Sequence, residues 1–235
     1  MNITFDYAYF TLTIPFVILW CLIYIFSKRT RKEQVIMSVL MISIGLLLET
    51  FYFNDYWTPH SILSFTIRKF NIFIEDILFF LSIGGISTVG YEIIFRKHLI
   101  KIKNYKIHVT QTLFIILAII IIMMFGLLAL GLNSIFATSL AFIVGALLIT
   151  SYRNDLFKEA IISGCIVMLI MLVSYLILLT IVTNSDEILS DGWLLYNSKL
   201  GVRFFGVPLT EMIWGFTFGM IVGPVYEFTR GYKFS

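Results

Sequence analysis

Residues 206–228, GVPLTEMIWGFTFGMIVGPVYEF, form an apolar stretch with a glutamate near each end. A second stretch, residues 73–93, repeats this pattern of acidic, aromatic and glycine positions. The matching pairs are Asp76 with Glu211, Phe79 with Trp214, Gly84 with Gly219, and Tyr91-Glu92 with Tyr226-Glu227. The two acidic positions are equally spaced in both copies, from 76 to 92 and from 211 to 227. The pattern indicates an internal duplication.

A third match precedes each copy, as Asp55-Tyr56-Trp57 and as Asp191-Gly192-Trp193. Three coincidences in the same order support the duplication more strongly than one would. We therefore predict a single membrane domain over residues 1–235. Repeat one covers about 7–95, a joining helix about 112–132, and repeat two about 135–228.

Composition predicts an integral membrane protein. Hydrophobic residues make up 59% of the 235 residues and charged residues 13%, and the mean hydropathy is +0.95. A soluble domain of this length would need more polar surface. Cys21 and Cys165 both lie in apolar runs, which predicts no disulfide framework. The net charge of +3 and the separated histidines indicate neither a nucleic-acid partner nor a metal site.

Seven apolar segments are long enough to cross a bilayer, since about 20 helical residues span its hydrocarbon core. They are Tyr7–Phe26, Val35–Phe53, Ile74–Phe95, Thr112–Leu132, Ile135–Tyr152, Ile161–Thr183 and Met212–Phe228. We predict an all-α integral membrane protein of seven transmembrane helices, with a parallel three-helix repeat (helices 1–3 and 5–7) joined by helix 4. Lys and Arg are concentrated in the loops after the first and third spans. This distribution predicts a multi-pass cell-membrane protein with its N-terminus outside and its C-terminus cytoplasmic.

Two loops, residues 54–71 and 184–210, are longer than a connection between helices requires. Each combines acidic residues with a tryptophan, Trp57 or Trp193, a mix that suits a segment lying in the membrane interface. Both loops directly precede a predicted carboxylate position. We therefore expect them to cover the functional site.

Six carboxylates lie within or at the ends of the predicted spans, where an ionised side chain costs several kcal/mol unless it is paired, hydrated or protonated. They are Glu49, Glu75, Asp76, Glu92, Glu211 and Glu227. Arg96 follows Glu92 by one helical turn, and Arg230 follows Glu227 similarly. We interpret Glu92 and Glu227 as helix-surface ion pairs at the cytoplasmic side.

Glu75, Asp76 and Glu211 have no basic neighbour within one turn. An apolar site with several carboxylates favours the neutral acid, which can donate a proton, so we predict these three as catalytic residues. The alternative is that Asp76 and Glu211 only cap their helices, but the duplication favours a functional role. Ring faces stabilise cations. We accordingly predict a substrate-binding set made of Glu49, Trp57, Phe79, Phe80, Trp193 and Trp214.

Residues 191–211 also resemble a known family. Asp191-Gly192-Trp193 with Tyr196, followed by Val207-Pro208-Leu209-Thr210-Glu211, is similar to the small non-flavin membrane lycopene cyclases, whose signature of Trp-x-Tyr before Pro-x-Glu-Glu occurs twice. Here the first copy reads Phe73-Ile74-Glu75-Asp76 and the second Pro208-Leu209-Thr210-Glu211. The missing proline and the missing glutamate indicate a divergent member, with another isoprenoid as a candidate substrate.

The resemblance implies a cofactor-independent cyclase or isomerase. An acid would protonate the terminal alkene of a lipophilic isoprenoid such as lycopene, aromatic faces would hold the cation, and a second carboxylate would remove a proton. The sequence has no dinucleotide fingerprint, which fits a redox-neutral reaction. Family members occur as single chains, heterodimers or fusions with phytoene synthase. The resemblance thus also implies a homo-oligomer or a partner biosynthetic enzyme.

Three other functions fit parts of the pattern. A non-enzymatic binder or carrier of an isoprenoid, pigment or lipid would use the carboxylates to hold a polar ligand end. A retinal photoreceptor is disfavoured because the last predicted span contains no lysine for a Schiff base. A transporter would more often show inverted repeats or broken helices.

Overall fold

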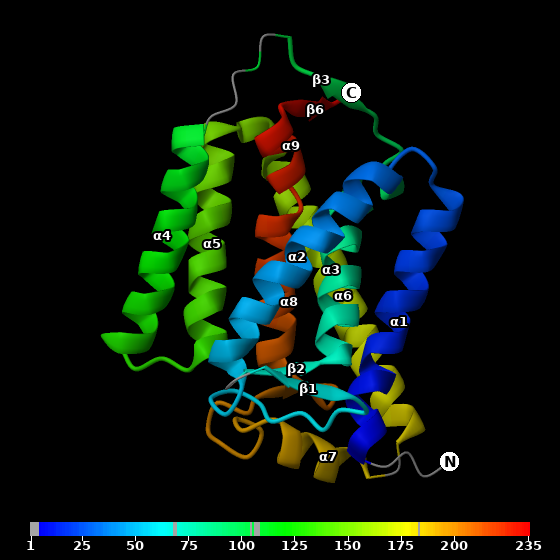
Figure 1. Cartoon of the computed structure of the whole chain (residues 1–235), viewed down its shortest axis with the longest axis vertical. Coiled ribbons are helices and arrows are strands. Elements are labelled where there is room, and N and C mark those ends of the chain that lie inside the picture. Colours follow the sequence, from blue (N-terminus) through cyan, green and yellow to red (C-terminus); the bar gives the residue numbers. More distant parts are fainter. Residues whose placement is uncertain (1–4, 68–69, 104, 106–108, 183) are drawn as a thin grey trace.

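Helices dominate the computed structural model, which describes residues 5–67, 70–103, 105, 109–182 and 184–235. The α-helices are α1 (Phe5–Phe26), α2 (Arg31–Tyr52), α3 (Ile74–Ile94), α4 (Val109–Leu128), α5 (Ser134–Tyr152), α6 (Phe157–Ile181), α7 (Ser185–Gly192), α8 (Leu209–Val222) and α9 (Val225–Arg230). A short 3-10 helix, Asn154–Leu156, leads into α6. Three small antiparallel sheets join the ends of the helices (Figure 1).

Six helices of the described chain, α1 to α6, are long and apolar enough to cross a membrane. They match the first six predicted spans to within a few residues, although Thr183, the predicted end of the sixth, lies outside the described residues. The predicted seventh span, Met212–Phe228, is divided into α8 and α9 at Gly223 and Pro224. A proline has no N–H to continue the hydrogen-bond ladder, which accounts for the break. The count of seven spans and the repeat stay predictions.

The core of the bundle lies around α3 and α8. Within its span, 72% of α3 is buried, against 17% of α4. Helix α4 packs on α5 at the edge of the bundle (Figure 1), and it exposes Leu113, Leu117 and Ile121. An apolar face open to the surroundings suits contact with lipid chains. The helices that can position buried polar groups are therefore α3, α8 and their neighbours.

Two hairpins stand at the same end of the bundle, below the starts of α3 and α8 in Figure 1. Strands β1 (Ser64–Ile67) and β2 (Phe70–Phe73) pair antiparallel and lead into α3. Strands β4 (Arg203–Phe204) and β5 (Val207–Pro208) do the same before α8. At the other end β3 (Leu99–Lys101) pairs with β6 (Tyr232–Phe234). The β1–β2 and β4–β5 hairpins thus each lead directly into a helix whose first turn contains a predicted catalytic carboxylate.

The two long loops meet at the hairpin end. The Thr58 N–H donates to the Gly192 carbonyl at 2.8 Å, and the Leu194 N–H donates to the Tyr56 carbonyl at 2.9 Å. The loops that were expected to cover the site therefore join each other across that end of the bundle. This junction brings Trp57 and Trp193 into contact, with their ring centroids 5.8 Å apart.

Glycines permit the close approach of α6 and α8. A Cβ added at Gly219 would stand 2.5 Å from the Ser163 carbonyl oxygen and 2.9 Å from the Gly164 Cα. Both neighbours are backbone atoms, so relieving the overlap requires the helices to separate. Small residues at helix interfaces serve this purpose in membrane bundles.

We expect Gly219→Ala to lower the free energy of unfolding by about 1–3 kcal/mol, the usual cost of overpacking a core. Gly192→Ala is the matched control, because nothing lies within 4 Å of a Cβ at that position. Thermal unfolding of the purified proteins in detergent measures the difference. Equal stability of both variants would contradict the tight packing of α6 on α8.

Candidate functional site

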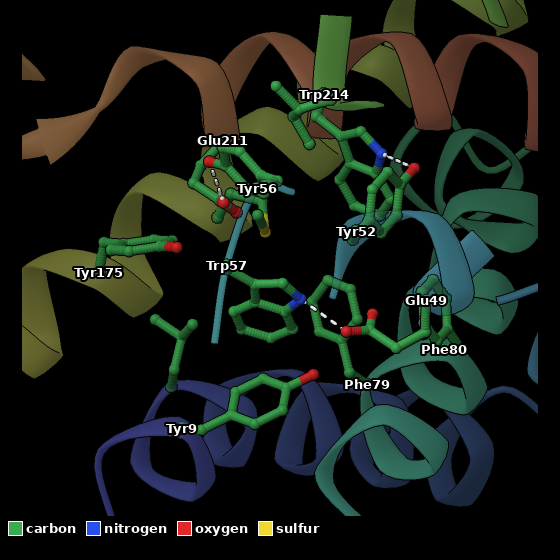
Figure 2. Close-up of a pocket in the computed structure, with 13 residues that line it drawn as sticks. Tyr9, Glu49, Tyr52, Tyr56, Trp57, Phe79, Phe80, Tyr175, Glu211 and Trp214 are labelled. Atoms are coloured by element: carbon green, nitrogen blue, oxygen red, sulfur yellow. Dashed lines mark hydrogen bonds between the residues drawn. The ribbon is translucent and has the colours of Figure 1, made fainter. Parts of the chain in front are cut away.

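A pocket lies inside the bundle near the hairpin end, and its cavity volume is about 40 Å³. Its lining comes from α1, α2, α3, α5, α6, α8 and the loop after α2. The lining residues are Tyr9, Leu12, Glu49, Tyr52, Tyr56, Trp57, Phe79, Phe80, Ile135, Met171, Tyr175, Glu211 and Trp214 (Figure 2). This volume has room for a few water molecules and is well below the range of about 300–1,000 Å³ typical of small-molecule sites. The pocket is mostly aromatic, with two carboxylates.

Glu211, in the first turn of α8, is held by donors from both long loops. Tyr56 donates its hydroxyl to Glu211 Oε1 at 2.5 Å, and Trp193 donates its indole N–H to the same oxygen at 2.9 Å. The Tyr56 hydroxyl also lies 2.9 Å from Thr210 Oγ1. Burial, and then the charge of Glu211, raise the pKa of Tyr56 well above its ordinary value, so the phenol remains a donor.

Glu49, on α2, faces the pocket from the opposite side. The Trp57 indole N–H donates to Glu49 Oε1 at 2.6 Å (Figure 2). Each of the two paired loop tryptophans therefore donates to a different pocket carboxylate. Both carboxylates are oriented by buried donors that also close this end of the pocket.

Asp76 reaches the pocket through another side chain. The Tyr9 hydroxyl, which lines the pocket, donates to Asp76 Oδ1 at 2.5 Å. Asp76 is fully buried, and its Oδ2 has no hydrogen-bond partner among the described residues. Asp76 is thus separated from the pocket by the Tyr9 ring.

Glu75 faces away from the pocket, toward the loop before β1. Its carboxylate accepts hydrogen bonds from the Ser61 hydroxyl at 2.5 Å and from the Ile62 N–H at 2.9 Å. The side chain is fully buried. These contacts tie the loop to the first turn of α3, and the predicted catalytic role of Glu75 stays a prediction.

Aromatic rings form the rest of the wall. Trp214 stacks on Phe79 with centroids 6.0 Å apart and on Phe218 at 5.0 Å, and it meets Phe80 edge-on at 6.4 Å. Its indole N–H donates to the Tyr52 hydroxyl at 2.8 Å, which fixes the ring plane. Ring faces attract cations and offer no strongly nucleophilic atom.

Of the predicted site residues, six line the pocket: Glu49, Trp57, Phe79, Phe80, Glu211 and Trp214. Trp193 contacts it through its hydrogen bond to Glu211, and Asp76 through Tyr9, whereas Glu75 does not reach it. The structure brings these side chains together. Their chemical roles stay predictions.

The predicted substrate-binding set left out the tyrosines of the pocket, Tyr9, Tyr52, Tyr56 and Tyr175. The Tyr175 hydroxyl is fully buried, lies beside Glu211 and has no hydrogen-bond partner among the described residues. Because tyrosine is common near membrane interfaces, a tyrosine in these segments did not by itself indicate a binding site. The position of Tyr56 inside the Asp55-Tyr56-Trp57 match was the available indication.

The interpretation of Glu92 and Glu227 as surface ion pairs was wrong. Both are buried, at 2% and 1% exposure, and Glu92 pairs with Arg29 Nε at 2.7 Å instead of with Arg96. Arg96 was predicted as the partner because it lies one turn from Glu92 on the same helix. The packing of α1 beside α3 brings Arg29 to Glu92 instead. Neither glutamate belongs to the pocket.

Comparison with known proteins gives one family. The sequence model of that family, described as lycopene cyclase, matches residues 133–229, from the start of α5 into α9. No curated protein and no solved structure matches the chain. The matched range contains Tyr175, Trp193, Glu211 and Trp214, and this match confirms the resemblance found in the sequence.

We expect Tyr56→Phe to lower the free energy of unfolding by about 1–3 kcal/mol, because the ring stays while the buried Glu211 loses a donor. Tyr152→Phe removes the hydroxyl of a half-exposed ring and should stay within about 0.5 kcal/mol of the unaltered protein. Thermal unfolding in detergent measures both. If Tyr56→Phe matches the control, the hydroxyl does not support Glu211.

Proposed function

Because residues 133–229 match the lycopene cyclase family model, we propose that this membrane protein catalyses an acid-initiated cyclisation, or an isomerisation, at one end of a polyene isoprenoid. The reaction needs no bound cofactor, because its steps add and remove a proton without changing the oxidation level. The observation that carries the proposal is the pairing of oriented carboxylates, Glu49 and Glu211, with an aromatic wall in one buried pocket.

The proposed steps balance in protons and electrons. A neutral carboxyl gives its proton to a terminal C=C bond, which leaves a tertiary carbocation. The electron pair of a neighbouring C=C bond attacks this cation and closes a ring, moving the positive charge to another carbon. A carboxylate then removes a proton from the adjacent carbon, and the new C=C bond forms. The product is an isomer of the substrate.

The geometry supports distinct tasks for the pocket groups. Both donors to Glu211 engage Oε1, and Trp57 engages Oε1 of Glu49. The second oxygen of each carboxylate is the one available for proton transfer to or from substrate. A general acid or base of this kind typically contributes about 10²–10⁴-fold to the rate.

Asp76 would act through Tyr9. Its Oδ2 lacks a partner among the described residues, and its Oδ1 accepts from the hydroxyl that faces the pocket. A proton could therefore pass between Asp76 and the pocket by way of that hydroxyl. Phe79, Phe80 and Trp214 would stabilise the cation while the ring closes.

The surroundings of the pocket support a lipophilic substrate bound by one end. The cavity of about 40 Å³ is small, so a terminal group has to move side chains of the aromatic wall to enter, and the remainder of a long polyene extends beyond the pocket. Exposed apolar side chains flank that end of the bundle, including Phe65 on one hairpin and Phe205 beside the other. Such side chains favour a lipophilic ligand that enters from the bilayer.

We also propose that α8 and α9 together complete a seventh span and that the chain is a parallel duplication. The supporting features are a hairpin that leads directly into both α3 and α8, and a carboxylate in the first turn of each. The basic loops support an outer N-terminus and a cytoplasmic C-terminus.

The decisive experiment is pigment analysis by chromatography in a bacterial host that accumulates lycopene. Expression of this protein should convert lycopene to a cyclic product, and Asp76→Asn or Glu211→Gln should each lower conversion at least about 10²-fold. Glu187→Gln, at an exposed position on α7, is the matched control and should retain activity. Protein levels are compared in membranes to separate loss of activity from loss of protein.

An active Asp76→Asn, Glu211→Gln double variant would overturn the proposed mechanism. If the unaltered protein and the variants all leave lycopene intact, ligands extracted from the purified protein identify the substrate class. An intact isoprenoid recovered equally from every variant would instead support the binding or carrier function.

A further inference from the structure

A second group of buried carboxyls lies at the end of the bundle opposite the pocket. Glu33, Glu92, Glu159 and Glu227 come from α2, α3, α6 and α9, and none is more than 5% exposed. Asp76 and Glu92 stand in the first and last turns of α3, so the length of that helix separates the two groups. The proposed cyclisation makes no use of the second group.

The four carboxyls form two contacting pairs. The carboxyl of Glu159 lies beside that of Glu227, and the carboxyl of Glu33 lies beside that of Glu92, so the two groups of each pair interact electrostatically. Two buried ionised carboxylates would repel each other, whereas a protonated carboxyl can donate to an ionised one. The arrangement therefore favours one proton in each pair.

An unpaired hydroxyl points to a ligand at the Glu159–Glu227 pair. Ser163 is fully buried, and its Oγ has no hydrogen-bond partner among the described residues. It lies one turn after Glu159 on α6 and faces Gly223, where an added Cβ would stand 2.6 Å from Ser163 Oγ. Gly223 comes one turn before Glu227. The hydroxyl is thus directed between the two helices that supply the pair.

The carboxyl oxygens next to it also lack donors. Apart from a shared proton, both oxygens of Glu159 and Oε2 of Glu227 have no partner among the described residues. A buried polar group without a partner costs free energy, and a bound water needs two to four such partners. Ser163 with the two carboxyls offers that number.

The charges around the cluster favour partial protonation. Arg29 contacts Glu92 directly, whereas Arg153 is hydrogen-bonded to Asp155 and acts on Glu159 and Glu227 through space. The titratable and charged groups that face the four glutamates are Arg29 before α2, Tyr91 on α3, Arg153 before α6 and Tyr226 on α9. Four ionised glutamates would carry twice as much charge as Arg29 and Arg153 together. One proton in each pair leaves two negative charges to balance these two positive ones.

We propose that Glu33 with Glu92 and Glu159 with Glu227 form an internal proton-binding site in which each pair holds one shared proton, and Ser163 binds a water at the second pair. Among the described residues no group of three or more His, Cys, Asp or Glu side chains has the geometry to hold a metal ion. A proton with water is therefore the ligand that fits. This site is independent of the proposed cyclisation.

The site joins four helices that contribute equivalent sequence. Lys32-Glu33 begins α2 and Lys158-Glu159 begins α6, whereas Tyr91-Glu92 ends α3 and Tyr226-Glu227 belongs to α9. Each pair contains one glutamate from a helix start and one from a later helix of the same predicted repeat. Loss of the shared protons would place like charges in contact and push these helices apart.

Infrared spectroscopy of the full-length protein in detergent tests the proposal directly, since a protonated carboxyl has its own carbonyl stretch. Glu159→Gln and Glu227→Gln should each remove one protonated carboxyl near neutral pH, because the remaining carboxylate can accept a hydrogen bond from the new amide. Glu187→Gln, at an exposed position, should remove none. An unchanged band in both variants would overturn the proposal.

Thermal unfolding across pH provides a second readout. The folded protein retains protons that the unfolded chain releases, so its unfolding temperature should be highest at mildly acidic pH and fall as the pH rises. Glu227→Gln should flatten this fall, because one proton-sharing pair is gone, while Glu187→Gln should follow the unaltered protein. The same fall in Glu227→Gln and in the unaltered protein would also overturn the proposal.

Discussion

The cost of burying carboxyl groups in an apolar bundle constrains this structure more than any other interaction. An ionised carboxylate in hydrocarbon is unfavourable unless donors or charges compensate it. At one end of the bundle, Tyr and Trp side chains supply the donors to Glu49, Asp76 and Glu211. At the other end, the glutamates meet Arg29 and one another. Each buried acid thereby fixes the position of the element that supplies its hydrogen-bond donor or its opposite charge.

This constraint accounts for the long loops at the pocket end. Glu211, in the first turn of α8, receives its two side-chain hydrogen bonds from Tyr56 and Trp193 in the loops, while the indole N–H of Trp214 on its own helix donates to Tyr52. The backbone hydrogen bonds between Thr58 and Gly192 and between Leu194 and Tyr56 hold those donors in register. The closing of the pocket and the orientation of its acid are consequences of the same contacts.

The sequence predicted what depends on local pattern and missed what depends on packing. Apolar length predicted the first six helices, and the carboxylate, tryptophan and phenylalanine positions predicted six of the thirteen residues that line the pocket, including Glu49, Trp57 and Glu211. The Glu92 interpretation failed because its partner, Arg29, comes from another part of the chain. Tyr9 escaped notice because nothing near it in sequence marks its contact with Asp76, sixty-seven positions away.

The differences between the two predicted repeats bear on the proposed chemistry. If Glu33 is aligned with Glu159, Glu49 falls on Tyr175, since both lie sixteen positions further along, from 33 to 49 and from 159 to 175. Both side chains line the pocket, one as a carboxyl held by Trp57 and the other as an unpaired phenol. A perfectly symmetric pocket would present the same group to both sides of a substrate. Cyclisation needs a donor and an acceptor of protons with different strengths. If the chain is the predicted duplication, the replacement of a carboxyl by a phenol at one of two equivalent positions would supply that difference, and the divergence of the two predicted repeats would serve the proposed function.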